Sequence, residues 1–600
     1  MSEYIIGIDL GTTNSALAYV HTGGEKDSPD VRLFPVPQLV NPGETAALNL
    51  LPSSLYIPGQ NEFVEGALAL PWNPQPDYIT GLLARIRGVE NATRLVSSAK
   101  SWLSNQNADA MQPLLPLTAP EGIKKISPLD ASRQYLLHLR SAWDYAHPEA
   151  KLESQTVLIT VPASFHAEAR ELTQRAAKLA GYPDVVIIEE PQAAFYAWIE
   201  RNPNWREQVK PGDSILVIDI GGGTTDFTLI AVTENSGELQ LERIAVGEHL
   251  LLGGDNMDLA LARYAEQQFA DKGKKLDAIQ FHSLWQQCRS AKEALLSSEV
   301  SSTNEYALTI LGRGSGLVGG TLRGKITRDE VWSLLLDGFF PSVPPDSAPQ
   351  RQRRAALMEV GLHYASDPAV TKHLAQFLRQ PGGFVRPTHL LLNGGVLQAG
   401  AIDQRIFEVV NGWLREAGAP ALTELQNETK QADLMHAVAQ GAAYYGLARA
   451  GKGVRIRGGV PRTYYVGVES SLPAVPGMPA PMKALVVVPF GLEEGSKVEL
   501  PQRKFALVVG EAAEFRFFSS LSRQTDNPGT LIEDIGENIE ELSPIEVFLP
   551  PHSDGTSEEI VPVTLESQVT ETGMLELWCV AADGRRWKLE FNVRERAAAA

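Results

Sequence analysis

The chain has 600 residues, which is too long for a single hydrophobic core, so we expect several domains. Hydrophobic residues make up 44% of it, as in ordinary globular proteins, and the net charge of −19 argues against nucleic acid as a partner because phosphates would be repelled. The sequence has no apolar run long enough to span a bilayer and no basic, signal-like start, so we expect neither a membrane segment nor secretion. Its two cysteines, Cys288 and Cys579, fit small buried side chains in a reducing compartment, and the cytoplasm is the expected location.

The first predicted element is YIIGIDLGTTNSALAYV, residues 4–20, in which an apolar strand ends in an aspartate and a second strand follows a short turn. This pattern predicts a β-hairpin whose glycine and hydroxyl residues suit phosphate oxygens, because glycine lets the backbone come close and successive N–H groups bind anions. A carboxylate beside phosphate is explained by a hydrated Mg²⁺ between them. Asp9 is therefore a candidate magnesium ligand. The candidate phosphate ligands are Gly11, Thr12, Thr13 and Asn14.

A strand, a proline turn and a helix are predicted next, from ITVPASFHAEAREL. The strand is expected over 156–161 and the helix over 167–179. Further along, VVIIEEPQAAFYAW predicts a strand over 185–188 and places Glu190 at its end, before Pro191. Glu190 is a candidate for orienting a water molecule or holding one that is bound to a metal.

The first pattern returns about 210 residues later as SILVIDIGGGTTDFTLIAV, residues 214–232, with Asp219 in the place of Asp9. One such hairpin is as often an ordinary turn as a binding site. Two copies indicate a duplicated α/β domain whose halves clamp a magnesium–triphosphate between the two aspartates. The candidate ligands of the second turn are Gly221, Gly222, Gly223 and Thr224.

Two glycine pairs are predicted to contact the rest of a nucleotide. In GEHLLLGGDNMD, Gly253 and Gly254 open a helix, whose N-terminus suits phosphate. In LLNGGVLQAG, Gly394 and Gly395 follow a buried strand, where only backbone can approach a flat base. The elements expected in this part of the chain are a strand at 389–392 and helices at 257–269, 284–296 and 437–448.

The sequence changes character after residue 450. Residues 451–462, GKGVRIRGGVPR, are interpreted as a linker, and short β-type runs between Gly, Pro and Asp clusters predict a β-sandwich over 463–600. These runs are KALVVVPF, KFALVVG, AEFRFFSS, PIEVFLP, VPVTLESQV, GMLELWCVA and RRWKLEFNV. Four apolar positions either line a groove that binds peptide by strand addition or belong to the core of the sandwich. They are Phe515, Phe517, Phe518 and Leu521.

The ordered motifs of residues 1–450 resemble those of the DnaK-like 70-kDa heat-shock (Hsp70) chaperone family. The motifs are IGIDLGTTNSALA, ITVPASF, IIEEPQAA, IDIGGGTTDFTLI, HLLLGGDNMD, SAKEALLSS, ITRDEV, LLNGGV and AVAQGAA. The resemblance implies an actin-like (ribonuclease H-like) α/β ATPase domain over 1–450, followed by a smaller all-β sandwich domain. Lobe I is expected at about 1–210, lobe II at about 211–420 and a return helix at 430–450. No helical lid follows the sandwich, which suggests a divergent, bacterial-type member.

The resemblance also implies roles for single residues. Lys100, in SSAKSWLS, resembles the catalytic lysine that stabilises charge on the transferred phosphate. Without the resemblance, the sequence favours an ordinary solvated lysine on a helix at this position. Asp9, Asp219 and Glu190 are expected around Mg²⁺ and the attacking water, with Thr224 among the catalytic residues.

Further residues match the part of the family pattern that contacts adenosine. Lys292, in SAKEALLSS, resembles an adenosine-contacting lysine, and Glu293 is a candidate for the ribose. Ser297 takes the place of the base-contacting hydroxyl if one residue is inserted, and Leu296 takes it otherwise.

Pro162 resembles the switch proline of the family, and Arg170 its partner on the next helix. Other positions depart from the family pattern: Val186 and Glu189 replace an arginine and an asparagine, and Gln398 replaces the arginine that stacks on adenine. The usual acidic linker is replaced by GVRIRGG. Recruitment of a J-domain co-chaperone is therefore doubtful.

The leading hypothesis is a chaperone for stressed or unfolded proteins. ATP and Mg²⁺, with K⁺ as a further candidate ion, bind between the lobes, and slow hydrolysis is coupled to binding and release of extended polypeptide in the β-domain. A nucleotide-exchange factor is an expected partner. Three alternatives stay open: a nucleotide-gated interaction module with a dedicated partner, a sugar or acetate kinase of the same superfold, and a filament-forming structural protein.

Overall fold

The structure is a computed structural model of the chain. It describes residues 2–23, 30–105, 108–117, 119–235, 238–247, 250–271, 273–296, 304–311, 321–350, 362, 364–380, 383–425, 434–451, 460, 462–469, 482–492, 496–520, 523, 525–533, 535–536, 539–542, 544–550, 559–570 and 574–592. The chain divides into two compact units, Met1–Leu239 with Ala245–Arg455 and Gln240–Ile244 with Ile456–Ala600. It is a mixed α/β protein with several sheets.

One sheet of the first unit carries the first hairpin. Its strands are β1 (Tyr4–Leu10), β2 (Asn14–His21), β3 (Arg32–Leu33), β6 (Leu51–Pro52), β10 (Thr156–Val161) and β11 (Val186–Glu189). Their order is β11-β10-β1-β2-β3, with β6 paired to β2. Strand β1 is antiparallel to β2 and parallel to β10, which places Asp9 beside Thr160. The predicted hairpin at residues 4–20 is confirmed.

A second sheet in the same unit repeats this plan. Its strands are β12 (Ser214–Ile220), β13 (Thr225–Asn235), β14 (Glu238–Val246), β19 (His389–Asn393) and β20 (Thr423–Glu424). The order is β14-β13-β12-β19-β20. Strand β12 is antiparallel to β13 and parallel to β19, which places Asp219 beside Asn393. The second predicted hairpin is therefore confirmed as well.

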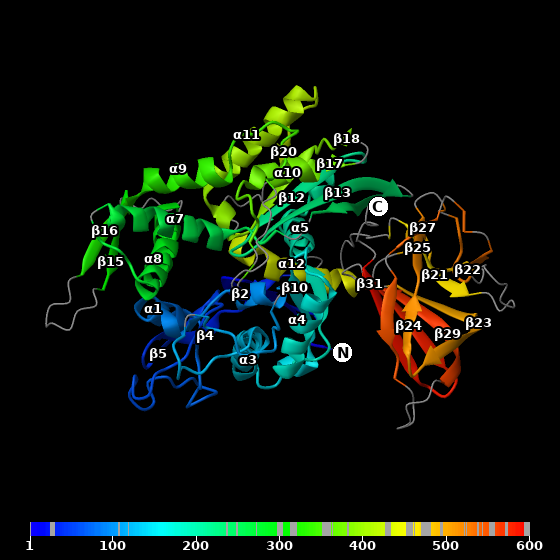
Figure 1. Ribbon diagram of the computed structural model, residues 1–600, viewed down its shortest axis with the longest axis horizontal. Coiled ribbons are helices and arrows are strands. Elements are labelled where there is room, and N and C mark those ends of the chain that lie inside the picture. The colour runs from blue at the N-terminus through cyan, green and yellow to red at the C-terminus, as the bar shows by residue number, and fades with distance from the viewer. Residues whose placement is uncertain are drawn as a thin grey trace. The chain divides into compact units, whose positions relative to one another are not determined.

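The helices of the first unit surround these two sheets (Figure 1). They are α1 (Leu82–Glu90), α2 (Ala99–Leu103), α3 (Pro128–Ala146), α4 (Ala167–Leu179), α5 (Glu190–Arg201), α6 (Trp205–Gln208), α7 (Gly254–Ala270), α8 (Ala278–Leu296), α9 (Arg328–Phe339), α10 (Val370–Leu378), α11 (Gly400–Glu416) and α12 (Leu434–Arg449). The shorter strands are β4 (Val36–Asn41), β5 (Glu44–Leu48), β7 (Leu55–Tyr56), β8 (Ile79–Thr80), β9 (Leu95–Val96), β15 (Glu305–Ile310), β16 (Leu322–Thr327), β17 (Arg379–Gln380) and β18 (Gly383–Phe384). No described helix combines the length and the hydropathy needed to cross a membrane.

Helix α4 matches its predicted bounds, whereas α8 begins at Ala278, before the predicted start at 284. The missed start is set by Asp277, whose carboxylate accepts hydrogen bonds of 2.9 Å from the N–H groups of Ile279 and Gln280. An aspartate in this position satisfies N–H groups that have no partner inside the helix. The capping residue, not the apolar pattern, therefore marks where this helix begins.

Helix α12 packs directly against the first sheet because small residues allow the backbones to approach. A Cβ atom on Gly7 of β1 would lie 2.3 Å from the carbonyl oxygen of Ala439, and one on Gly441 would lie 1.7 Å from that of Ala193 in α5. Both distances are far below a normal contact. Most of α12 is buried, as expected for a helix that is apolar on every side.

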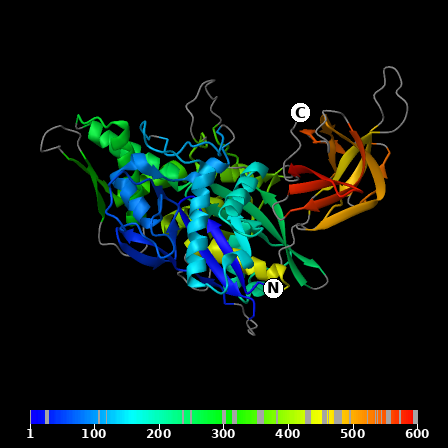
Figure 2. The same cartoon turned by 90° about the horizontal axis from the view of Figure 1, so that it is seen from below.

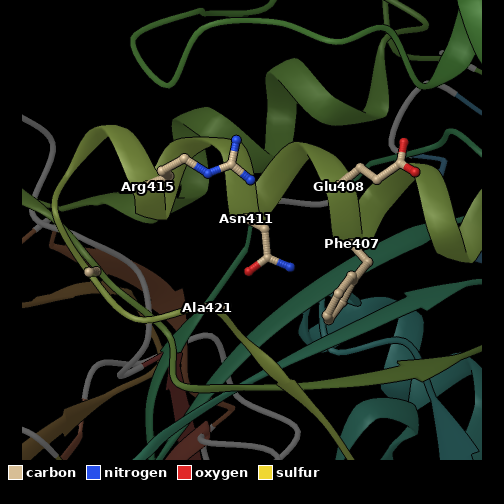
Figure 3. Close-up of a pocket in the computed structure, with 6 residues that line it drawn as sticks. Phe407, Glu408, Asn411, Arg415 and Ala421 are labelled. Atoms are coloured by element: carbon tan, nitrogen blue, oxygen red, sulfur yellow. The ribbon is translucent and has the colours of Figure 1, made fainter.

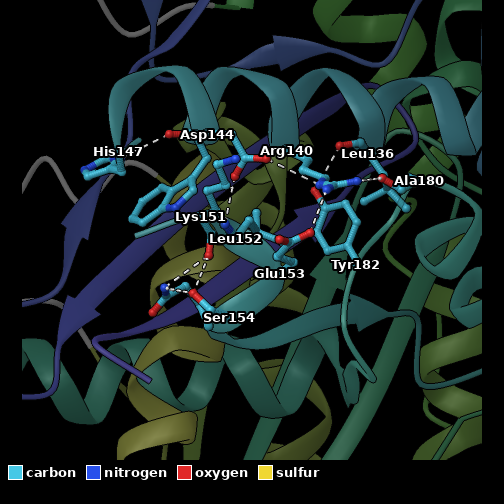
Figure 4. A network of polar contacts seen from close by, with 12 residues as sticks. Leu136, Arg140, Asp144, His147, Lys151, Leu152, Glu153, Ser154, Ala180 and Tyr182 are labelled. Atoms are coloured by element: carbon cyan, nitrogen blue, oxygen red, sulfur yellow. Dashed lines mark hydrogen bonds and ion pairs between the residues drawn. The ribbon is translucent and has the colours of Figure 1, made fainter. Parts of the chain in front are cut away.

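Helix α3 is tied to the chain after α4 by a network of polar contacts (Figure 4). The Tyr182 hydroxyl donates to the carbonyl oxygen of Leu136 at 2.9 Å, and Arg140 donates to that of Ala180 at 3.0 Å. Arg140 also forms an ion pair with Asp144, at 3.4 Å. These contacts fix the C-terminal end of α4, whose other end carries His166 and follows the proline turn.

In the described part of Ile456–Ala600, every element is a strand, as Figures 1 and 2 show in yellow to red. The strands are β21 (Thr463–Glu469), β22 (Met482–Val488), β23 (Lys497–Val509), β24 (Ala512–Phe515), β25 (Phe517–Ser520), β26 (Leu531–Ile532), β27 (Glu540–Glu541), β28 (Ile545–Phe548), β29 (Glu559–Val569), β30 (Met574–Ala581) and β31 (Arg586–Asn592). They form sheets with the orders β26-β22-β21-β25-β27, β23-β29-β30-β31 and β24-β28. Val487 of the first sheet and Leu577 of the second belong to one hydrophobic core.

The run AEFRFFSS, predicted as one strand, is two. Strand β24 pairs with β28, whereas β25 pairs with β21 and β27, and the break falls at Arg516. Phe517 and Phe518 are buried in hydrophobic cores, and Phe515 packs against one of them. For Phe517 and Phe518 the core alternative is therefore confirmed, while Leu521 lies outside the described residues. Both cysteines are free and buried, as predicted, and burial raises the pKa of each thiol to about 12.

Candidate functional site

The first hairpin is shaped by contacts on both sides of its turn. The Thr160 hydroxyl donates to a carboxylate oxygen of Asp9 at 3.2 Å. Ser53 holds the turn from the other side, because its hydroxyl donates to the carbonyl oxygen of Gly11 at 2.7 Å and its N–H donates to that of Thr13 at 2.9 Å. The turn is therefore fixed by bonds to its carbonyl groups, while Asp9 is the second-last residue of strand β1.

The second hairpin has a comparable frame. The N–H of Gly221 donates to the carbonyl oxygen of Thr224 at 3.0 Å and closes the turn. The side-chain amide of Asn393 donates to Asp219 at 2.7 Å. Asp226, opposite Asp219 in the strand pair, accepts a hydrogen bond of 3.2 Å from the N–H of Ser164. The second turn and its carboxylates are therefore held by β19 and by the chain after β10.

The two turns lie against each other. A Cβ atom on Gly222 would be 1.9 Å from the hydroxyl oxygen of Thr13, and one on Gly223 would be 3.0 Å from that of Thr12. Glycine is required at both positions because any side chain would displace these hydroxyls. Predicted phosphate ligands from positions about 210 residues apart in the sequence are thus brought together.

Lys100 and Glu190 form a buried ion pair at this site. Lys100 belongs to the short helix α2, and only 4% of its surface is exposed. Glu190 begins helix α5, directly after β11. The interpretation of Lys100 as an ordinary solvated lysine is therefore wrong, and the pair contributes both a cation and an anion to the site.

The carboxylates of the site are buried close to one another, and both burial and mutual repulsion raise their pKa values. Burial raises the pKa of Asp9 to about 7, against the attraction of Lys100 and with added repulsion from Glu190. Burial raises the pKa of Asp219 well above its ordinary value, and Glu190 adds to the rise. The pKa values of Glu190 and Asp226 are raised by burial too. A site of this kind favours a cation that offsets the negative charge.

The residues fit a hydrated magnesium ion bound with a polyphosphate. Among the described residues, no group of three or more His, Cys, Asp or Glu side chains is arranged to hold a metal ion directly. Magnesium in phosphate sites takes most of its ligands from water and phosphate oxygens and only one or two from carboxylates. Asp9 and Asp219 on facing hairpins match that need, and Glu190 lies close enough to raise the pKa of both.

The N-terminus of α7 packs onto the second turn. The N–H of Gly254 donates to the carbonyl oxygen of Gly221 at 3.0 Å, and that of Asp255 donates to Gly222 at 2.7 Å. A Cβ atom on Gly253 would lie 2.7 Å from the carbonyl oxygen of Gly221. The predicted glycine pair thus supports the phosphate turn through its backbone, at the edge of the same site.

A buried polar network that the sequence analysis missed joins this helix to α2 and α8. The hydroxyl of Ser98, just before α2, donates to Asp255 at 2.6 Å, and Asp255 pairs with Arg289. Arg289 also donates to Asp258 at 2.8 Å, and Lys292 lies 2.6 Å from the same carboxylate. Ser98 is a non-glycine residue with a φ of 55°. This uncommon backbone conformation is the only local feature that sets Ser98 apart, and a sequence does not reveal it.

Four of the residues predicted to contact adenosine are described, and one is not. Lys292 donates to the carbonyl oxygen of Gly254 at 3.0 Å, which places it near the phosphate turn. Glu293 is exposed on α8, and Ser297 lies outside the described residues. Gly394 has a φ of +98°, and a Cβ atom there would be 2.6 Å from Asp219. Gly395 is exposed.

The predicted partner of the switch proline is also fixed by a buried contact. Arg170 donates to the carbonyl oxygen of Ala163 at 3.0 Å and to Glu189 at 3.1 Å. Glu189 is 1% exposed. The glutamate that departs from the family pattern is therefore an internal ion-pair partner, not a surface residue.

A separate pocket of about 620 Å³ lies along helix α11 (Figure 3). Its lining residues are Phe407, Glu408, Asn411, Arg415, Ala419 and Ala421. The side chain of Asn411 accepts a hydrogen bond of 2.8 Å from the N–H of Leu422, so it serves the fold. None of the predicted site residues lines this pocket.

The chain was compared with models of known protein families. A family model described as "Hsp70 protein" matches residues 116–342 of the chain. The matched segment contains the proline turn, Glu190 and the whole second hairpin, as well as the start of α7.

Proposed function

The chain belongs to the Hsp70 family, and from that premise we propose that it is an ATP-driven molecular chaperone. Members of this family bind nucleotide with a divalent metal ion and hydrolyse ATP, so a chaperone-type, ATP-binding role holds for the family as a whole. The finer proposal is that this chain hydrolyses ATP slowly between an actin-like pair of lobes and couples hydrolysis to the binding of unfolded polypeptide.

One observation carries the proposal: two Asp-ended hairpins face each other around a buried Lys100–Glu190 pair. The hydroxyls and backbone groups of the turns supply hydrogen-bond donors, and Asp9, Asp219 and Glu190 supply carboxylates. Phosphate oxygens need the former and a hydrated cation needs the latter. A magnesium–triphosphate satisfies both at once.

Hydrolysis follows from the positions of these side chains. Bound Mg²⁺ supplies positive charge beside the phosphates. Lys100 neutralises charge that develops on the terminal phosphate, and Thr12 and Thr13 donate hydrogen bonds to phosphate oxygens. Glu190, whose charged form is favoured by Lys100, accepts a hydrogen bond from the attacking water. The water oxygen bonds to the terminal phosphorus as the bond to the bridging oxygen breaks, the proton of the water passes to the phosphate that forms, and ADP and inorganic phosphate leave.

The β-rich unit is proposed to bind extended polypeptide. Phe548 and Ile560 are large apolar residues there with 60% and 64% of their surface exposed. Extended chains bind sheets by adding a strand and placing apolar side chains against such residues.

A nucleotide-gated interaction module with one dedicated partner is the second candidate. It is favoured by the burial of Phe517 and Phe518, which leaves a groove lined by these residues unavailable. A J-domain co-chaperone is not proposed as the partner, because Glu189 is engaged with Arg170 inside the protein.

The full chain tests both candidates. We expect Mg²⁺-dependent ATP hydrolysis, and binding of fluorescent unfolded peptides that weakens when ADP is replaced by ATP. The double variant Phe548→Ser with Ile560→Ser should weaken peptide binding without changing hydrolysis. Hydrolysis without peptide binding, together with nucleotide-dependent capture of one protein, favours the interaction module. ADP release that requires a hexose or acetate would replace both with a kinase.

A further inference from the structure

Ser101 lies where the two hairpins meet and has no assigned role. It directly follows Lys100 in helix α2, and 2% of its surface is exposed. Its hydroxyl has no hydrogen-bond partner among the residues that the structure describes. A buried hydroxyl left unpaired costs about 1–3 kcal/mol, so such a group within a binding site indicates a bond that a ligand completes.

The position of the hydroxyl is fixed by Gly223. A Cβ atom on Gly223 would lie 2.6 Å from the Ser101 hydroxyl oxygen and 3.0 Å from that of Thr12. The two hydroxyls therefore flank the same point of the second turn. Glycine is needed at 223 for space, because any side chain would push Ser101 away from the turn.

The neighbours of Ser101 indicate what it binds. The hydroxyl of Thr12, beside the same glycine, is a hydrogen-bond donor, and the preceding residue, Lys100, brings a cation to the same site. A ligand that meets such a set is an acceptor with negative charge, which matches a phosphate oxygen. On the basis of the proposed function, we propose that Ser101 donates a hydrogen bond to the terminal phosphate of ATP.

This assignment predicts a difference between ATP and ADP. The Ser101→Ala change should weaken binding of a non-hydrolysable ATP analogue about tenfold, because a hydrogen bond to a charged group is lost. Binding of ADP should stay within about twofold. The nucleotide-free variant should melt at the same temperature as the natural protein or higher, because an unpaired buried polar group has been removed.

Ser104→Ala is the matched control. Ser104 follows the same helix and is buried, but its hydroxyl donates to the carbonyl oxygen of Ser101 at 3.1 Å. Its removal should lower the melting temperature and leave the ratio of ATP to ADP affinity unchanged. The two serines thus separate a phosphate contact from a structural bond.

The experiment is calorimetric titration of the full chain and both variants with the magnesium complexes of the ATP analogue and of ADP. A ratio of affinities that falls about tenfold in Ser101→Ala alone supports the assignment. An unchanged ratio in Ser101→Ala, with normal binding by the natural protein, overturns the assignment and leaves the proposed function standing. If the natural protein binds neither nucleotide, the proposed function fails first, and the assignment fails with it.

Discussion

The two hairpins share a backbone plan but differ in the charges around their aspartates. Asp9 lies beside Thr160 and Asp219 beside Asn393, at matching positions of the parallel neighbouring strands. Each neighbour donates a hydrogen bond to its aspartate, at 3.2 Å from Thr160 and 2.7 Å from Asn393. Lys100 opposes the rise in the pKa of Asp9, whereas the strongest opposing influence on the pKa of Asp219 is the neutral amide of Asn393.

The difference indicates which parts of the plan are repeated and which are not. The strand pair, the aspartate near its end and the donor beside it occur twice, but Lys100 is a main influence on the pKa of Asp9 and not on that of Asp219. Lys100 also attracts Asp226 of the second hairpin, so the asymmetry concerns the two aspartates themselves. Asp219 is the less compensated of the two, and we expect a bound cation to stabilise it more than Asp9. The predictions below test this asymmetry.

The largest effect is expected at Lys100. Lys100→Met removes the cation that we propose to face the transferred phosphate, so ATP hydrolysis should fall by about 10²–10³-fold, while nucleotide binding falls much less. Single-turnover hydrolysis and a separate binding titration check this. Lys151→Met, at an exposed lysine, is the control and should leave both unchanged. Hydrolysis within twofold of the natural rate in Lys100→Met would contradict the role of the lysine.

The next largest effect compares the two aspartates directly. Asp219→Asn removes a buried and poorly compensated charge, so the metal-free protein should become more stable by about 1–3 kcal/mol. Asp9→Asn should give a smaller gain, or a loss, because Lys100 already compensates that charge. Both variants should lose magnesium-dependent hydrolysis. Urea unfolding in the presence of a chelator measures the stabilities, and a larger gain for Asp9→Asn would reverse the asymmetry.

The raised pKa values predict a dependence of stability on pH. The folded protein keeps a proton on Asp9 up to about pH 7, whereas the unfolded chain releases it near 3.8, and Asp219 shifts in the same direction. These groups therefore stabilise the metal-free fold at low pH, and their contribution is lost as pH rises through this window. The melting temperature of Asp219→Asn should fall less between pH 5 and 7.5 than that of the natural protein. An equal fall in the melting temperature of the two proteins over this pH range would count against a raised pKa of Asp219.

The smallest effects are expected at the donors beside the aspartates. Asn393→Ala removes the shorter bond and should destabilise the protein by about 1–3 kcal/mol, whereas Thr160→Val should cost about 1 kcal/mol. Thermal unfolding of the two variants at pH 7.5 ranks them. A greater loss for Thr160→Val would show that the bond lengths do not reflect their energies.

Much of this architecture follows from local patterns in the sequence. The strands that carry Asp9 and Asp219 near their ends are apolar runs, and each is followed by a glycine-containing turn and a second apolar run. The bounds and pairing of these strands could therefore be predicted. The start of α8 could have been predicted from Asp277, which caps it, had that signal been weighted above the apolar pattern. The division of residues 512–520 into two strands at Arg516 could not have been predicted from local patterns. It depends on distant strands, because β24 pairs with β28 and β25 pairs with β21.

Some features of the candidate site could likewise be predicted from the sequence, and others could not. Glycines and hydroxyls in the turns could be predicted because their chemistry is local. The burial of Lys100 depends on Glu190, 90 positions later, and the link from Ser98 to Asp255 spans 157 positions. Ser101 was missed because nothing beside it in the sequence marks an unpaired hydroxyl. Contacts of this range arise only when distant segments of the chain are folded together.

Titration of the full chain with ATP, with and without Mg²⁺, tests the central claim most directly. The natural protein and the double variant Asp9→Asn with Asp219→Asn should be compared by calorimetry at one pH. If a magnesium–triphosphate lies between the hairpins, the natural protein binds ATP more tightly with Mg²⁺, and the double variant loses that gain. ATP binding that is indifferent to Mg²⁺ in the natural protein, or a gain that survives in the double variant, would contradict the account.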